Sequence, residues 1–259
     1  MTAGPVAPPV RRLVVWRHGR TEWNASGRFQ GQLDPPLDDE GRAQAARTAP
    51  YLAAALGGVE TVLVSSDLRR AVDTAGALAP LLGVPVRVDE RLREHGLGSW
   101  EGLTRDEVEE RHPDQYGEWL AGQPVPGRGG EAQADVAARA LAAVAALPAA
   151  TAAVLVTHGG TAGRLMEGLL GLGPEHRRIF GPLGNCHWSE LSFQQSGWRL
   201  MRHNLSAPPP GQREGGPRPA GDRGPFPSPS ASDAPDAVRA GANPEEAPPA
   251  LVEDADAAG

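Results

Sequence analysis

Three runs of mostly apolar residues each stop abruptly at a group of polar residues. The runs cover 13–16, 61–64 and 152–156, and Arg-His-Gly, Ser-Ser-Asp and Thr-His-Gly-Gly follow them. A short continuous apolar run is typical of a strand that is buried on both faces, as in a parallel sheet. We therefore predict three parallel strands, and a further short strand at 86–88, with polar side chains near their carboxyl ends.

Apolar residues at spacings of three and four predict helices between and after these strands. The sequence Thr-Arg-Asp-Glu at 104–107 has the spacing of a capping box, so a short helix is expected to begin there and end before Pro113. The other helices are expected at 39–56, 68–82, 135–147 and 160–170, and two antiparallel edge strands at 185–193 and 198–202. This order predicts an α/β fold, a three-layer α/β/α sandwich with a mostly parallel central sheet and a helical cap insert at about 104–130.

Composition changes sharply near both ends of the chain. Residues 208–259 consist largely of Ala, Pro, Gly, Ser and acidic residues, with almost no large apolar side chains. Such a segment cannot bury enough apolar surface to offset the entropy lost on folding. We predict a disordered tail at 208–259, a disordered N-terminus at 1–10 and a single domain at 11–207.

The charge and the single cysteine narrow the range of functions. The formal net charge is −7 and there is no long basic run, which argues against nucleic acid as the main ligand. No apolar run is long enough to suggest a signal peptide or a membrane span. Cys186 is alone, which excludes an intramolecular disulfide and a cysteine-based metal site. We expect a cytoplasmic protein without a membrane or nucleic-acid partner.

The polar residues at the predicted strand ends have a common chemistry. Arg17 and His18 follow the first strand, Arg69 the second and His158 the last of the three. If the strands are parallel neighbours, these side chains converge on one rim of the sheet. Cationic groups around an imidazole form a site for a dianion such as phosphate, to which Asn24 could add a neutral donor.

An imidazole among cations tends to stay neutral, because like charges disfavour its protonated form. Neutral His18 could therefore attack phosphorus and hold the phosphoryl group before water removes it. The leaving oxygen then needs a proton, and Glu94 in the glycine-rich loop at 91–98 is the candidate. The alternative is a metal site made of His18, His158 and Glu94, but two nearby arginines would repel a cation. We predict no metal and no cofactor.

Four motifs in order resemble those of the histidine phosphatase superfamily, in its phosphoglycerate mutase-like branch. They are R-H-G-R-T-E-W-N at 17–24, S-S-D-L-R-R-A at 65–71, Glu94 before G-L-G-S-W-E-G at 96–102, and H-G-G at 158–160. The resemblance implies a metal-independent phosphomonoesterase with a phosphohistidine intermediate. It gives His18 the role of nucleophile, Glu94 that of proton donor, and Arg17, Arg69 and His158 that of phosphate ligands. It also implies that Asn24, Gln30 and Gly159 bind substrate or phosphate. Arg70 stands beside Arg69, and the motif assigns the phosphate contact to Arg69.

Within that branch the chain is most similar to the actinobacterial glucosyl-3-phosphoglycerate phosphatases, for example in F-Q-G-Q-L-D at 29–34 and L-G-N-C-H-W at 183–188. It departs from them at Ala132, where a serine usually follows Gly-Gly-Glu, and in its long tail. The resemblance implies that the substrate is a small phosphate ester, and the first candidate is glucosyl-3-phosphoglycerate. It also implies a possible homodimer. The alternatives are a phosphoglycerate mutase, another sugar-phosphate or α-ribazole phosphate phosphatase, and a phosphate-binding protein without activity. Mutases of this branch bind a bisphosphate cofactor with lysines, and the chain has no lysine. Hydrolysis is therefore favoured over mutase activity.

Overall fold

One mixed sheet forms the centre of the fold. The computed structural model of the chain describes residues 8–173, 176, 179–195 and 197–208. Within them the sheet has the strand order β3-β2-β4-β1-β5-β6. Its strands are β1 (Val10–Arg17), β2 (Thr61–Ser65), β3 (Val86–Val88), β4 (Ala150–Thr157), β5 (Trp188–Gln194) and β6 (Gly197–Leu205). The first four run parallel, while β5 pairs antiparallel with both β1 and β6. The predicted mostly parallel sheet with an antiparallel edge is confirmed.

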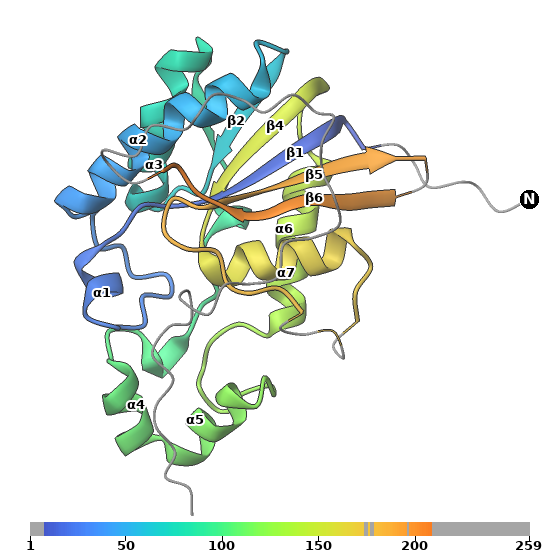
Figure 1. The fold of residues 1–259 in the computed structure, drawn as a ribbon. Coiled ribbons are helices and arrows are strands. Elements are labelled where there is room, and N and C mark those ends of the chain that lie inside the picture. Colours follow the sequence, from blue (N-terminus) through green and yellow to red (C-terminus); the bar gives the residue numbers. More distant parts are fainter. Residues whose placement is uncertain (1–7, 174–175, 177–178, 196, 209–259) are drawn as a thin grey trace, which may run out of the picture. The chain divides into compact units, whose positions relative to one another are not determined.

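Helices cover both faces of this sheet (Figure 1). On one face, α2 and α3 pack on Val14 and Trp16 of β1. On the other face, α6 and α7 pack on Leu13 and Val15 of the same strand, because successive side chains of a strand point to opposite faces. The helices are α1 (Glu22–Ala25), α2 (Asp39–Leu56), α3 (Arg69–Leu82), α4 (Arg105–Arg111), α5 (Pro113–Leu120), α6 (Gln133–Ala145) and α7 (Gly159–Leu169), with 3-10 turns η1 (Glu90–Leu92) and η2 (Gly98–Trp100). The three-layer sandwich is confirmed.

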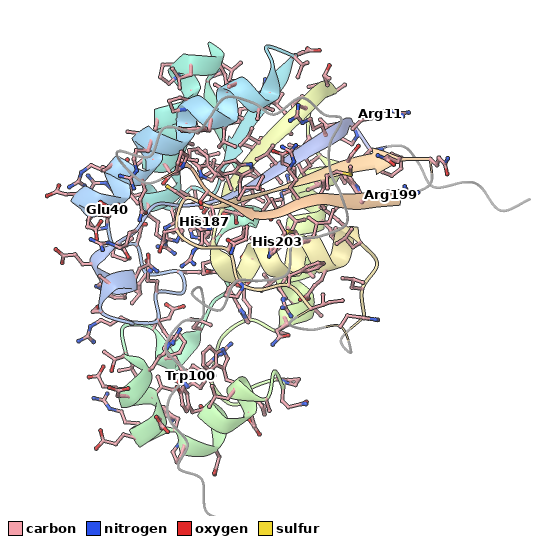
Figure 2. All side chains as sticks on the ribbon, viewed as in Figure 1. Arg11, Glu40, Trp100, His187, Arg199 and His203 are labelled. Carbon is pink, nitrogen blue, oxygen red and sulfur yellow. The ribbon has the colours of Figure 1, made fainter. Side chains whose placement is uncertain are left out.

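The predicted insert contains α4 and α5. The capping box at Thr104 is present, since its hydroxyl accepts from the backbone of Glu107 and the Glu107 carboxylate accepts from the backbone of Thr104. The helix α4 ends before Pro113, as predicted. Pro113 then starts α5, because proline fits the first turn of a helix. Figure 2 places Trp100 at the insert, where its indole contacts the rings of Phe29 and Trp119.

The predicted disordered ends fall mostly outside the described residues, which exclude 1–7 and 209–259. At the N-terminus the expected boundary at residue 10 is wrong. Val10 is 1 % exposed and pairs with Ala150 of β4, so the first strand begins earlier than its apolar run. Among the described residues, no helix combines the length and the apolar character that a membrane crossing requires.

Candidate active site

Two buried histidines lie side by side at the carboxyl ends of β1 and β4. Arg17 pairs with Thr157 in the parallel register, so the residues that follow them, His18 and His158, emerge together. Their ring centroids are 5.0 Å apart, and both side chains are buried. The predicted convergence of these two histidines is confirmed, and its cause is that β4 pairs directly with β1.

The imidazole of His18 has a fixed tautomer. Its Nδ1 lies 2.7 Å from the carbonyl oxygen of Gly19. A carbonyl only accepts, so Nδ1 carries the proton and Nε2 keeps its lone pair. Burial, followed by the charges of Arg70 and Arg17, lowers the pKa of His18 well below its usual value. The ring therefore stays neutral at physiological pH, with a nucleophilic nitrogen at Nε2.

Arg17 lies beside this pair as predicted. Its Nη1 donates to the carbonyl oxygen of Leu183 at 2.5 Å, and its charge contributes to the lowered pKa of both histidines. Its Nε is buried and has no hydrogen-bond partner among the described residues. A buried donor without a partner costs free energy, so this nitrogen is suited to binding an anion.

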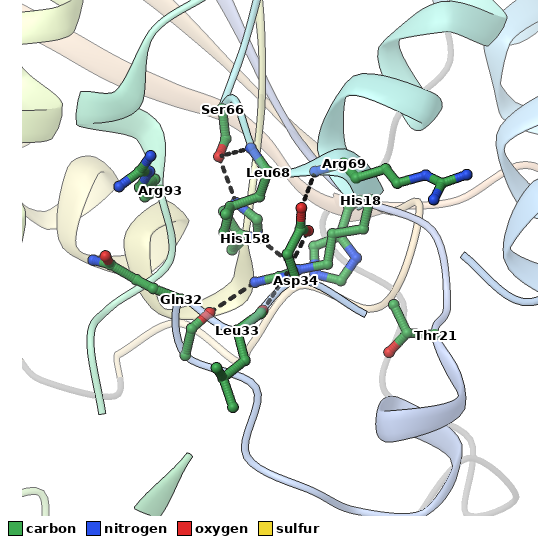
Figure 3. A network of polar contacts seen from close by, with 12 residues as sticks. His18, Thr21, Gln32, Leu33, Asp34, Ser66, Leu68, Arg69, Arg93 and His158 are labelled. Carbon is green, nitrogen blue, oxygen red and sulfur yellow. Dashed lines mark hydrogen bonds and ion pairs between the residues drawn. The ribbon is translucent and has the colours of Figure 1, made fainter. Parts of the chain in front are cut away.

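The predicted position of Arg69 is wrong. Its side chain is 69 % exposed, and its Nε lies 3.6 Å from the carboxylate of Asp73. Figure 3 shows the guanidinium of Arg69 pointing away from His158. Each residue of a helix is rotated by about 100° from the previous one, so α3 cannot direct both Arg69 and Arg70 at the site.

Arg70 takes the predicted place of Arg69. Its side chain is fully buried, and its Nε donates to Nδ1 of His158 at 3.2 Å. Its two terminal nitrogens donate to the carbonyl oxygens of Leu33 and Gly31 at 2.6 and 2.8 Å. A signal for Arg70 was present in the sequence, because it lies eight residues before the buried Leu78 and so shares its helix face.

His158 is held between Arg70 and a serine. Because Nε of Arg70 can only donate, Nδ1 of His158 accepts, and Nε2 is left to donate to the hydroxyl of Ser66 at 2.9 Å. Figure 3 shows the contact between His158 and Ser66. Burial, followed by the charge of Arg70, lowers the pKa of His158 well below its usual value. Ser66, which directly follows β2, was not predicted to contribute to the site.

Glu94 reaches the same rim from the loop after η1. One carboxylate oxygen accepts from the backbone nitrogens of His95 and Thr161, and the other from Gly160, at 2.8 to 3.1 Å. Gly160 and Thr161 belong to the first turn of α7, for which His158 is the N-cap. A Cβ atom at Gly160 would lie 2.7 Å from Oε1 of Glu94, so glycine is required for this approach. Glu94 and His158 are thus brought together by the start of one helix.

The predicted binding residue Asn24 lies near this centre, to which Asn185 links it. The amide oxygen of Asn24 accepts from the backbone of Thr21 and from the side chain of Asn185, which leaves its nitrogen to donate elsewhere. Asn185 also donates to the carbonyl oxygen of His18. Gln30 is buried, and its amide oxygen has no partner among the described residues. Gly159 opens α7, and a Cβ there would lie 3.4 Å from the guanidinium carbon of Arg17.

The arrangement is suited to an anion. Two guanidinium groups flank two neutral imidazoles, and the nearest carboxylate is held by backbone donors at the edge of the group. Within the described residues, no cluster of three or more His, Cys, Asp and Glu could hold a metal ion. Guanidinium groups match the geometry of phosphate oxygens. The site can therefore bind a phosphate group next to a nucleophilic nitrogen and a carboxyl group.

Comparison with known proteins gives consistent matches. The sequence profile of the histidine phosphatase superfamily (branch 1) matches residues 13–206. A glucosyl-3-phosphoglycerate phosphatase of Mycolicibacterium vanbaalenii is 41 % identical over 219 residues, which cover 76 % of this chain and 96 % of that protein. A probable phosphoglycerate mutase GpmB of Cronobacter sakazakii is 38 % identical over 193 residues, covering 72 % and 87 %.

Solved structures match the same part of the chain. A mycobacterial glucosyl-3-phosphoglycerate phosphatase in complex with VO3 superposes with a TM-score of 0.67 at 42 % identity, covering 76 % of this chain and all of that one. A putative α-ribazole-5'-P phosphatase of Escherichia coli gives a TM-score of 0.64 at 26 % identity, covering 74 % and 94 %.

Proposed function

The chain belongs to the histidine phosphatase superfamily (branch 1) and is a phosphatase, and we propose that it hydrolyses glucosyl-3-phosphoglycerate through a phosphohistidine at His18. The observation that carries this proposal is the buried, neutral His18 with its free Nε2 beside Arg17 and Arg70. The name of the 41 % identical mycobacterial relative supports the choice of substrate.

In the first step, Nε2 of His18 attacks phosphorus and the bond to the ester oxygen breaks. Arg17 and Arg70 bind the phosphoryl oxygens and stabilise the charge that spreads over them in the transition state. The amide nitrogen of Asn24 supplies a further donor. His158 can donate as well, once its ring rotates so that the Nε2 proton points at the phosphoryl group and no longer at Ser66. The free Nε of Arg17 is the donor that the bound anion satisfies.

Glu94 completes the proton balance. Its protonated carboxyl group gives a proton to the leaving ester oxygen, and the resulting carboxylate takes a proton from the water that attacks the phosphohistidine. The second step breaks the bond between phosphorus and Nε2, so phosphate leaves and His18 and Glu94 return to their initial states. The guanidinium groups supply the charge stabilisation, so we propose that no metal is needed.

A phosphoglycerate mutase is the second candidate, because the 38 % identical GpmB protein carries that name. A mutase must return the phosphoryl group to a second hydroxyl and therefore has to retain a bisphosphate. The chain has no lysine for this purpose, which favours hydrolysis. Cytoplasmic location and a homodimer stay predictions from the composition and from the resemblance.

A phosphate-release assay tests the substrate assignment. The purified chain should release phosphate from glucosyl-3-phosphoglycerate with a kcat/KM at least about tenfold above that for 3-phosphoglycerate or α-ribazole phosphate, since a matching pocket discriminates by this order. Added 2,3-bisphosphoglycerate should not raise the rate. Interconversion of 3- and 2-phosphoglycerate that depends on this bisphosphate would instead support the mutase.

A further inference from the structure

A cavity of about 350 Å³ opens directly beside the proposed proton donor. Its walls include Gly160, whose backbone nitrogen donates to Glu94, and Leu183, whose carbonyl oxygen accepts from Arg17. Glu94 protonates the leaving oxygen in the proposed mechanism, so the rest of the leaving group must continue from this point. The cavity therefore lies where the remaining atoms of a large leaving alcohol would have to be bound.

The wall of the cavity combines an aromatic ring with polar groups. Trp119 of α5 lines it, and its indole is fixed by stacking on Tyr116 at 5.7 Å and by edge contact with Phe29 at 5.4 Å. On α7, Arg164 donates to Glu167 at 2.7 Å and to the amide oxygen of Gln133 at 3.0 Å. These contacts hold the polar groups in fixed positions.

The chemistry of this wall fits a neutral ligand with several hydroxyl groups. Among the described residues that line the cavity, Arg164 forms an ion pair with the carboxylate of Glu167, so this guanidinium is matched by a negative charge within the lining itself. The amide oxygen of Gln133 is bound by Arg164, which leaves its nitrogen as the donor. A hydroxyl group both donates and accepts, and therefore suits neighbouring amide, guanidinium and carboxylate groups. The volume lies near the lower end of the range for small-molecule sites, which favours one ring.

We propose that this cavity binds the sugar ring of the leaving group, with Gln133, Arg164 and Glu167 contacting its hydroxyl groups and Trp119 covering one face. This inference rests on the proposed function and identifies the part of the site that recognises the glucosyl group. It makes Gln133 and Glu167 determinants of substrate specificity, separate from the residues that bind the phosphoryl group.

The test is the ratio of kcat/KM for glucosyl-3-phosphoglycerate to that for 3-phosphoglycerate, which lacks the sugar. Gln133→Leu removes the amide and should lower this ratio about tenfold, mainly through KM, as expected for lost hydrogen bonds to a bound hydroxyl. Glu167→Gln should lower the ratio in the same direction while keeping the side-chain shape. The matched control is Gln194→Leu at the end of β5, which lies at the opposite end of the sheet and should leave the ratio unchanged.

The outcomes separate the two proposals. A wild-type ratio near one would refute the glucosyl substrate and with it the sugar site. A high wild-type ratio that both Gln133→Leu and Glu167→Gln retain would overturn the sugar site alone and leave the proposed function in place. Equal losses on both substrates would also overturn it, because the residues would then support catalysis in general.

Discussion

Arg69 and Arg70 are adjacent in the sequence, but their guanidinium groups lie in different environments. Arg70 is buried against His158 and two backbone carbonyls, whereas Arg69 lies at the surface near Asp73. Of these two arginines, Arg70 contributes to the lowered pKa values of His18 and His158. Substitutions of the two residues can therefore be compared directly. Replacing Arg70 removes a guanidinium of the site, and replacing Arg69 removes a charge at the surface.

Arg70→Ala should lower kcat/KM by about 100- to 1000-fold, the effect of losing one donor to the transition-state charge. Arg69→Ala should change it by less than about twofold, because an exposed ion pair contributes little. Steady-state kinetics with p-nitrophenyl phosphate measures both effects, and thermal denaturation checks that each variant folds. A larger loss for Arg69→Ala than for Arg70→Ala would show that the assignment of the second arginine is wrong.

The sequence predicted the histidines well and the second arginine badly. His18 and His158 follow strands, and the direction of a buried strand fixes where the next residue emerges. Arg69 and Arg70 open a helix, where a shift of one position turns the side chain by about 100°. The choice between them depends on which face of α3 packs on the sheet, and the motif assigned the phosphate contact to the wrong arginine.

At the scale of elements, α6 holds the loop that carries Glu94. Arg139 of α6 donates to the carbonyl oxygens of Arg91, Arg93 and Glu94 at 2.7 to 2.9 Å. Its Nε also donates to Glu131 at 2.8 Å, and Glu131 in turn accepts from the backbone of Gly96 at 2.7 Å. One guanidinium and one carboxylate thus fix the loop on both sides of Glu94. We regard Arg139 as a positioning residue for Glu94, the proposed proton donor.

Arg139→Leu should displace Glu94 and therefore slow substrates whose leaving oxygen needs a proton. We expect kcat for glucosyl-3-phosphoglycerate to fall at least about tenfold, within the range that general acid catalysis contributes. The rate with p-nitrophenyl phosphate should fall much less, because nitrophenolate leaves without a proton. Arg87→Leu at an exposed position of β3 is the matched control. Equal losses of Arg139→Leu on both substrates would indicate a merely structural role.

The long elements were predictable, as were the capped helix α4 and the short strand β3, whereas the helix α1 and the 3-10 turns were not. The helix expected at 39–56 is α2 with the same bounds. α1 has four residues, none of them buried, and depends on the contacts of Thr21 and Asn24. The 3-10 turns beside Glu94 likewise depend on tertiary contacts. Elements of this size leave no periodic signal in the sequence.

At the scale of all described residues, the order of the strands in the sheet determines which side chains meet in the site. Placing β4 between β1 and β2 brings His18, His158 and Ser66 to one edge, although they are far apart in the sequence. The sequence predicted strands that end in polar residues, but not the order of those strands. The cavity that we propose for the sugar ring was not predicted either, since its lining comes from the insert, α6 and α7 together. Such contacts between distant elements have no local pattern.

The central claim is that Nε2 of His18 carries the phosphoryl group during turnover. The most direct test mixes the protein with substrate, quenches at alkaline pH, which preserves phosphohistidine, and locates the modification by mass spectrometry of peptides. We predict a phosphoryl group on His18 in the native chain, and neither modification nor turnover in a folded His18→Ala variant. Phosphate release by His18→Ala at the native rate, or a phosphoryl group on another residue, would contradict the account.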